Sequence, residues 1–296
     1  MTQQTHDQYE PDPQDNDVTR RDFVAMGLAA GVVAAALPAS AAMPVVETMV
    51  EIKTADGTCD AAFSHPTTGT HPAVIIWPDA FGLRPAIREM GKRLAGEGYA
   101  VLTVNPYYRV GHGTLLDTKT FSFQNDRAKL TPLMGSITAD GAAERDAAAF
   151  VAWLDTQKQV NTSKKIGTQG YCMGGPLVMR TSAAVPNRIG AGASFHGGGL
   201  VTKNANSPHL LVPRIKAKMY FGVASNDDMQ QPTAKDDLKA AFEAAKNPAK
   251  IEVYPSLHGW CMSDMPVAAG APPIYNQADA ERAWGELLAL YKAALA

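Results

Sequence analysis

The sequence has few cysteines, little imbalance of charge and no hydrophobic run long enough to cross a bilayer comfortably. Its 296 residues include three cysteines, which are too few for a disulfide framework and lack the C-x-x-C spacing of zinc and haem sites. The 27 basic and 29 acidic residues leave a formal net charge of −2, whereas a nucleic-acid-binding protein needs a basic surface. With 46% hydrophobic and 19% charged residues, the chain is expected to be globular rather than disordered.

The N-terminus has the pattern of an export signal. Arg20 and Arg21 precede a mostly apolar stretch over residues 24–37, which is too short for a stable membrane span. Small residues follow at 38–42, as at a cleavage site. This order resembles a twin-arginine signal and predicts passage through the twin-arginine export machinery to the bacterial periplasm or the medium. An uncleaved helix or a membrane anchor is the alternative.

Removal of the leader and signal, residues 1–41, leaves residues 42–296 as one predicted domain. Short apolar runs alternate there with longer helical segments, and continuous apolar runs are typical of strands buried on both faces. We therefore expect a three-layer α/β domain with a mainly parallel sheet. Residues 106–138 do not fit this alternation and are expected to cross the sheet edge where ligands bind. The predicted strands are 73–77, 100–104, 165–170, 189–195, 217–223 and 250–254, and the helices are 84–97, 139–157, 176–184, 235–245 and 278–295.

The most informative motif is Gly170-Tyr171-Cys172-Met173-Gly174-Gly175, between a predicted strand and a helix. It has the G-x-nucleophile-x-G form of a nucleophile elbow, with cysteine in place of serine. Glycines permit the sharp turn, and a position at the amino end of a helix favours the thiolate form of Cys172. A buried cysteine in a glycine-rich turn is the structural alternative.

An acid and a histidine follow at suitable places. Asp227 and Asp228 come after one predicted strand, and His258 comes after the next. Because the carboxyl ends of parallel strands meet at one edge of a sheet, these side chains are expected to lie near Cys172. Cys172 then attacks a carbonyl, His258 transfers the proton and Asp227 orients the imidazole, with Asp228 as the alternative acid. The six other histidines have no metal-ligand spacing, and we expect no metal.

Several segments together resemble the dienelactone hydrolase family. The resemblance spans residues 47–294 and implies an α/β-hydrolase fold with a Cys-Asp-His triad at Cys172, Asp227 and His258, so it favours Asp227 over Asp228. The segments that carry it are the elbow, Asp79-Ala80-Phe81-Gly82-Leu83, Ser194-Phe195-His196-Gly197-Gly198, Ser207-Pro208-His209-Leu210-Leu211 and His258-Gly259-Trp260.

The resemblance also implies roles around the nucleophile. It places the oxyanion hole at the backbone N–H groups of Ala80 and Met173, and such a donor is worth about 2.7–4 kcal/mol. Where the family has a glutamate that holds the resting thiol, this chain has Asp79, whose alternative role is to cap the following helix. The family's arginine shortly after the catalytic histidine is missing, since Gly-Trp-Cys-Met-Ser-Asp follows His258. Dienelactone itself is therefore not the expected substrate.

Five further residues are candidates for the substrate pocket. Arg88 and Arg109 are possible partners for an anion, although ion pairs at the surface are the commoner role. Tyr108 and Trp260 are possible aromatic walls, with core packing as the alternative. His196, at a predicted strand end beside three glycines, lines the pocket or packs structurally.

Three functions fit these residues. The first is an exported hydrolase that cleaves a small-molecule ester or lactone through a thioester and needs no cofactor. The second is a thiol redox protein in which Cys261 resolves an oxidised Cys172. The third is a ligand-binding module without turnover. A Cys59–Cys261 disulfide is conceivable in an oxidising compartment, but free buried thiols are the default.

Overall fold

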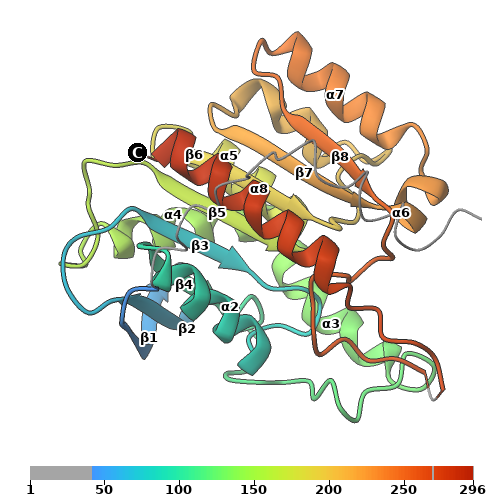
Figure 1. Ribbon diagram of the computed structural model, residues 1–296, viewed down its shortest axis with the longest axis horizontal. Coiled ribbons are helices and arrows are strands. Elements are labelled where there is room, and N and C mark those ends of the chain that lie inside the picture. Colours follow the sequence, from blue (N-terminus) through green and yellow to red (C-terminus); the bar gives the residue numbers. More distant parts are fainter. Residues whose placement is uncertain (1–41, 269, 296) are drawn as a thin grey trace, which may run out of the picture. The chain divides into compact units, whose positions relative to one another are not determined.

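The computed structural model describes residues 42–268 and 270–295, and the predicted leader and export signal lie outside this part. The described residues form an eight-stranded sheet, and helices pack on both of its faces (Figure 1). The strands are β1 (Val45–Thr54), β2 (Gly57–Pro66), β3 (Ala73–Trp77), β4 (Ala100–Val104), β5 (Ile166–Tyr171), β6 (Ile189–Phe195), β7 (Lys218–Ala224) and β8 (Lys250–Tyr254).

The strand order is β1-β2-β4-β3-β5-β6-β7-β8. β1 and β2 form an antiparallel hairpin, and β2 is also antiparallel to β4. From β4 to β8 all neighbouring strands are parallel. The residues of β3 and β4 are buried throughout, as expected for strands covered on both faces. Every carboxyl end from β3 to β8 therefore points to the same edge.

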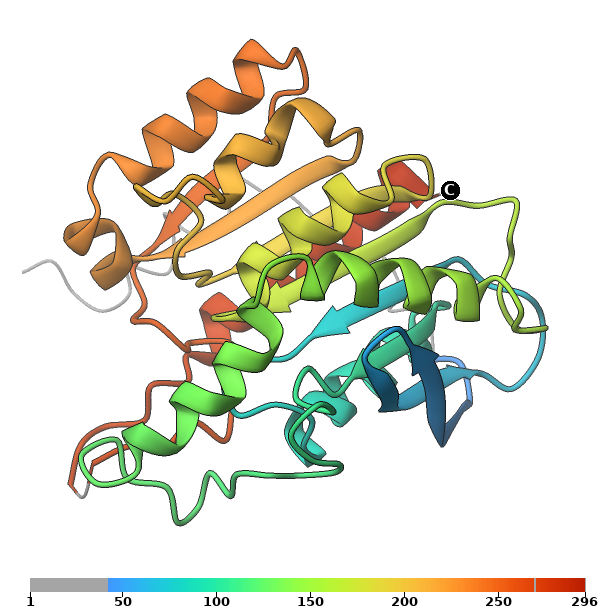
Figure 2. The ribbon, with the colours of Figure 1, turned by 180° about the vertical axis from the view of Figure 1, so that it is seen from behind.

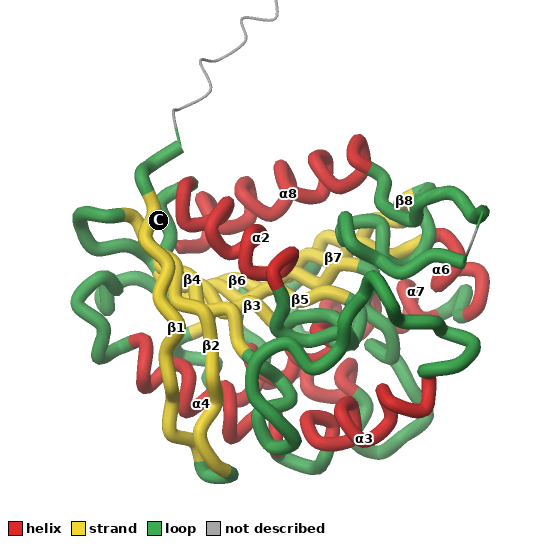
Figure 3. Tube along the Cα trace, turned by 90° about the horizontal axis from the view of Figure 1, so that it is seen from below, coloured by secondary structure: helices red, strands yellow, loops and turns green. Residues whose placement is uncertain are grey.

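The helices cover the two faces in separate groups. Figure 3 shows α2 and α8 on one side of the sheet and α3 and α4 on the other, and α4, α5 and α7 lie in front of the sheet in Figure 2. The helices are α2 (Pro85–Gly96), α3 (Arg127–Thr138), α4 (Ala142–Leu154), α5 (Gly174–Ala184), α6 (Ser225–Gln230), α7 (Ala234–Ala244) and α8 (Gln277–Leu295), with a 3-10 helix, η1, at Pro208–Arg214.

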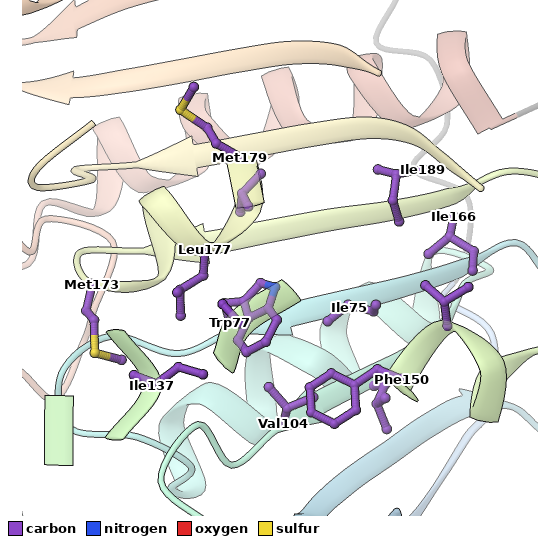
Figure 4. Close-up of a cluster of buried hydrophobic side chains, with 14 of the residues drawn as sticks. Ile75, Trp77, Val104, Ile137, Phe150, Ile166, Met173, Leu177, Met179 and Ile189 are labelled. Carbon is purple, nitrogen blue, oxygen red and sulfur yellow. The ribbon is translucent and has the colours of Figure 1, made fainter. Parts of the chain in front are cut away.

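A buried hydrophobic cluster lies between the sheet and the helices α4 and α5, and it extends to the carboxyl end of β3. Trp77, at the end of β3, packs against Phe150 of α4 with ring centroids 5.6 Å apart (Figure 4). Its indole N–H donates to the Thr181 hydroxyl of α5 at 3.0 Å. Met173 extends from the elbow into the same cluster. The end of β3 is thus packed firmly beside the turn that carries Cys172.

The predicted three-layer α/β architecture is confirmed, and the strand order is consistent with an α/β-hydrolase fold. The described residues begin with an antiparallel hairpin of two ten-residue strands, β1 and β2, which the sequence did not predict. Within the segment 106–138, expected to be irregular, α3 covers the last twelve residues. Among the described residues, no helix is long and apolar enough to cross a membrane.

Candidate active site

Cys172 lies at the sharp turn between β5 and α5, with its backbone in the left-handed region at a φ of 53°. A Cβ atom on Gly170 would stand 2.2 Å from the carbonyl oxygen of Gly174, and one on Gly174 would stand 2.3 Å from that of Trp77. Only glycine fits at such close approaches of backbone. The turn presents the half-buried Cys172 side chain at the amino end of α5, which is the geometry of a nucleophile elbow.

The loop after β3 passes directly against this turn and carries Ala80. The Tyr107 hydroxyl bridges the two segments, since it donates to the Ala80 carbonyl oxygen at 2.9 Å and lies 3.3 Å from the Met173 sulfur. Within the described part of the chain, the backbone N–H groups of Ala80 and Met173 meet no protein acceptor. Two such donors beside a nucleophile are suited to stabilising an oxyanion.

His258 is held in place by the short helix α6, which follows β7 directly. Its Nδ1 lies 2.7 Å from Oδ2 of Asp227, and its backbone N–H donates to Oδ1 of Asn226 at 2.8 Å. Asp228, the other candidate acid, pairs instead with Lys235 at 2.7 Å. The hydrogen bond to Asp227 fixes the ring so that Nε2 is left for proton transfer.

The proton affinity of His258 follows from its neighbours. Burial opposes the charged form, but the hydrogen bond to Asp227 and the interactions with Cys172 outweigh it and raise the pKa of His258 to about 10. At neutral pH the imidazole is therefore protonated. An imidazolium beside a cysteine favours the thiolate, which is the nucleophilic form.

Asp79 has partners other than the nucleophile. Its buried carboxylate accepts from the Arg84 guanidinium at 2.7 and 2.9 Å and from the backbone N–H of Phe81 at 2.9 Å. Among the described residues, no hydrogen bond joins Asp79 to Cys172. The contact with Phe81 lies within the loop after β3, and Asp79 does not cap α2, whose amino end has no side-chain cap.

His196 and Trp260 lie close to His258 in the fold. The fully buried His196 ring is 5.0 Å from the rings of both His258 and Trp260, and its backbone adopts a φ of 40°. Burial, together with His258, holds the pKa of His196 well below its ordinary value, so the ring is neutral. Trp260 stacks on Tyr254 with centroids 4.7 Å apart. His196 therefore packs against His258, and Trp260 packs against His196 and Tyr254 in turn.

Three pocket candidates are engaged elsewhere. Arg88 pairs with Glu47 of β1. Arg109 bonds to Asp146 and Asp56 at 2.7 Å each, and its guanidinium stacks on the Tyr108 ring at 4.5 Å. The Tyr108 hydroxyl lies 2.7 Å from Asp146. The structure does not bring Arg88, Arg109 or Tyr108 into contact with the triad, because carboxylates on other elements neutralise or bind them.

All three cysteines are free thiols. Cys59 belongs to the hydrophobic cluster on the α4 and α5 face, whereas Cys261 belongs to the cluster on the α2 and α8 face. No Cys59–Cys261 disulfide is therefore present. Burial raises the pKa of Cys261 well above its usual range, so this thiol is poorly suited to resolve an oxidised Cys172.

Several cavities lie near these residues. One of about 180 Å³ is lined by Asp227, Asp228 and the glycines after His196. One of about 360 Å³ runs from Met173 and the glycines after His196 along α5. Another of about 270 Å³ lies between α2 and α8 and contains Cys261. No group of three or more acidic, histidine or cysteine side chains suited to a metal occurs within residues 42–268 and 270–295. The cavity along α5 adjoins Met173, an oxyanion-hole candidate.

The sequence analysis missed Asn226, Arg84 and Asp264. Asn226 holds the backbone of His258, and its position beside Asp227 in one short turn was a usable signal. Arg84 bonds to Asp79 and also to Asp264, at 2.8 and 2.9 Å. Nothing in the local sequence connects Arg84 with Asp264, which lies 180 residues further along the chain.

The comparisons with known proteins agree with the fold. The model of the dienelactone hydrolase family matches residues 59–295. The chain belongs to the dienelactone hydrolase family. Carboxymethylenebutenolidase 1 of Cupriavidus pinatubonensis is 26% identical to this family member over 210 residues, covering 71% of this chain and 84% of the relative. A carboxymethylenebutenolidase of a Pseudomonas species is 27% identical over 206 residues, covering 68% and 79%.

A solved structure supports the fold of this family member. A dienelactone hydrolase-like promiscuous phosphotriesterase from metagenomic libraries superposes with a TM-score of 0.68 at 22% identity, covering 87% of this chain and all of that chain. At this identity the likeness concerns the fold alone. The family assignment makes the chain an enzyme of a lactone and ester hydrolase family.

Proposed function

We propose that the protein hydrolyses a small carboxylic ester or lactone through a Cys172–His258–Asp227 triad. The observation that carries the proposal is the convergence at one sheet edge of an elbow cysteine with a histidine whose Nδ1 is bound by Asp227. The family assignment supports the reaction class. No cofactor is needed, because the chain itself supplies the nucleophile, the proton carrier and the oxyanion donors.

The reaction proceeds in two halves. The Cys172 thiolate attacks the carbonyl carbon, a C–S bond forms, and the N–H groups of Ala80 and Met173 stabilise the oxyanion. Collapse breaks the C–O bond, and the leaving alkoxide takes the proton of the His258 imidazolium. His258 then accepts a proton from water, which attacks the thioester and releases the acid and the thiolate.

Hydrolysis rates on a panel of short-chain aryl esters and simple lactones test this proposal. The full chain is assayed under reducing conditions, which suppress any thiol oxidation. Turnover of at least one ester class supports a hydrolase. Turnover confined to peroxide or disulfide substrates would favour the redox reading, although the buried Cys261 thiol argues against it.

Asp227→Asn should move the alkaline limb of the rate profile. His258 has its pKa raised to about 10 by Asp227 and Cys172, so it stays protonated at neutral pH and loses its proton as the pH rises through that value. The leaving group then lacks its acid, and kcat/KM falls. Without the Asp227 charge we expect this limb about one pH unit lower, with activity reduced but not abolished. An unchanged limb in a pH–rate profile would contradict the role of Asp227.

We also propose that the protein is exported through the twin-arginine machinery, on the evidence of Arg20, Arg21 and the apolar and small-residue segments after them. Arg20→Lys/Arg21→Lys should retain the charge but prevent recognition. Fractionation of bacteria that express the full chain should then show it shifting from the periplasm to the cytoplasm. An equal periplasmic amount of the variant would overturn this route.

A further inference from the structure

A buried arginine holds together the loops around the candidate oxyanion hole. Arg84 is 2% exposed, and its guanidinium bonds to both carboxylate oxygens of Asp79 and to both of Asp264. The Thr118 hydroxyl donates to Asp264 at 3.3 Å. Arg84 thus joins the loop after β3 to the segment after His258, and Asp264 connects this pair to the segment before α3 through Thr118. Figures 1 and 2 both show the last two segments side by side.

This group, Asp79, Arg84 and Asp264, which we call the Arg84 cluster, carries two carboxylates and one guanidinium. Burial disfavours the charge on Arg84, but the two carboxylates outweigh it and raise its pKa. The cluster therefore has an excess of one negative charge. Asp79 is buried, whereas the Asp264 side chain is 28% exposed, so the excess charge faces solvent through Asp264.

The cluster lies beside the reacting groups. Asp79 immediately precedes Ala80, an oxyanion-hole candidate. Burial raises the pKa of the Tyr107 hydroxyl, and the nearby Asp79 and Cys172 raise it further. On the other side, Met265 follows Asp264 and reaches Gly259, next to His258, where a Cβ atom would stand 3.0 Å from the methionine methyl group. The Arg84 cluster is therefore connected both to the loop that carries Ala80 and to the turn that carries His258.

Nearby cations do not balance this excess. Arg88 and Arg109 are paired with other carboxylates, and Lys235 is paired with Asp228. Lys119 and Arg127, on the segment that crosses the sheet edge, are exposed, and solvent screens exposed charges much more strongly than buried ones. The imidazolium of His258 is balanced by the Asp227 carboxylate to which it is bonded, so it does not offset the excess either.

We propose that the Arg84 cluster makes this site select substrates without a carboxylate near the scissile bond, with Asp264 as the specificity-determining residue. The inference rests on the proposed hydrolase function for its substrate. The charge effect at Cys172 can be measured without any turnover. Asp264→Asn removes the excess charge while retaining the shape of the side chain. Glu281→Gln is the matched control, because Glu281 pairs with Arg93 at an exposed site on α2 and α8.

Alkylation of Cys172 tests the charge directly. Full-chain protein is treated with iodoacetamide, which is neutral, or iodoacetate, which is anionic, and peptide mass spectrometry confirms the labelled residue. A change in the thiolate fraction affects both reagents equally and cancels in the ratio of their rates. In Asp264→Asn we expect the iodoacetate-to-iodoacetamide ratio to rise about fivefold, and in Glu281→Gln to stay constant. Asp264→Ser, checked for an intact melting transition, should behave like Asp264→Asn.

Hydrolysis of two phenyl acetates that share the same acetyl group completes the test. Methyl para-acetoxybenzoate is neutral and para-acetoxybenzoate is anionic, and each kcat/KM is divided by the rate of hydroxide hydrolysis. The wild type should prefer the neutral ester about tenfold, and Asp264→Asn should narrow the preference. Equal preference, or an alkylation ratio that Asp264→Asn leaves unchanged, overturns the inference. Cleavage of neither ester with the expected alkylation ratio would instead count against the hydrolase function alone.

Discussion

Cys172→Ala should reduce kcat/KM for the best ester substrate by about four orders of magnitude or more. The variant retains the oxyanion donors and the His258–Asp227 pair but has no atom that can form the thioester. Alanine also fits the turn without new contacts, so the melting temperature should change little. Initial rates at matched protein concentration, with circular dichroism to check folding, provide the measurement.

Cys261→Ala is the matched control for this change. Cys261 is a buried thiol on the α2 and α8 face, so its removal should leave the hydrolysis rate unchanged. If Cys172→Ala keeps full activity, the triad assignment is wrong. If instead Cys261→Ala abolishes a thiol-dependent reaction, the resolving role for Cys261 is restored.

Arg84→Met should destabilise the fold by about 3–5 kcal/mol. The change leaves the fully buried Asp79 carboxylate, which now bonds to Arg84 through both oxygens, without its counter-ion. It also releases Asp264 from the loop after β3. Urea unfolding should show a lower midpoint with an unchanged slope, because the loss is one of stability rather than of compactness.

Arg93→Met provides the comparison for this effect. Arg93 pairs with Glu281, and both side chains are nearly half exposed, at 45% and 47%, so the loss should be about 1 kcal/mol or less. The double variant Asp79→Asn/Arg84→Met should recover part of the stability, because it removes the uncompensated charge. If Arg84→Met and Arg93→Met lower the free energy of unfolding by the same amount, the Arg84 cluster stabilises the fold no more than an exposed ion pair does.

The central sheet could be predicted because its strands are short apolar runs buried on both faces. The hairpin strand β1 could not, since it is largely exposed or half-buried and lacks a continuous apolar run. Helix α3 contains Pro132 and has only three buried residues, so no clear helical periodicity marks it. Asp227, expected in a loop, lies instead in the short helix α6.

The site was predictable where chain order and turn chemistry fix it. Glycine at 170 and 174 indicates a turn that no larger residue can make, and the acid and histidine follow successive parallel strands. Ionic partners are different, because they depend on residues far apart in the sequence. Arg109 was a candidate for substrate binding, but Asp56 and Asp146 hold it, and neither partner can be inferred from the residues around Arg109.

Direct observation of an acyl-enzyme tests whether hydrolysis proceeds through a thioester on Cys172. The full chain is mixed with an activated aryl ester, quenched in acid within the first turnovers, digested and measured by mass spectrometry, with His258→Ala assayed in parallel. If Cys172 is the nucleophile, we expect an acyl group on the peptide that contains Cys172. It should form together with a burst of the released phenol and should be absent from Cys172→Ala. Steady turnover with the acyl group on another side chain would contradict it.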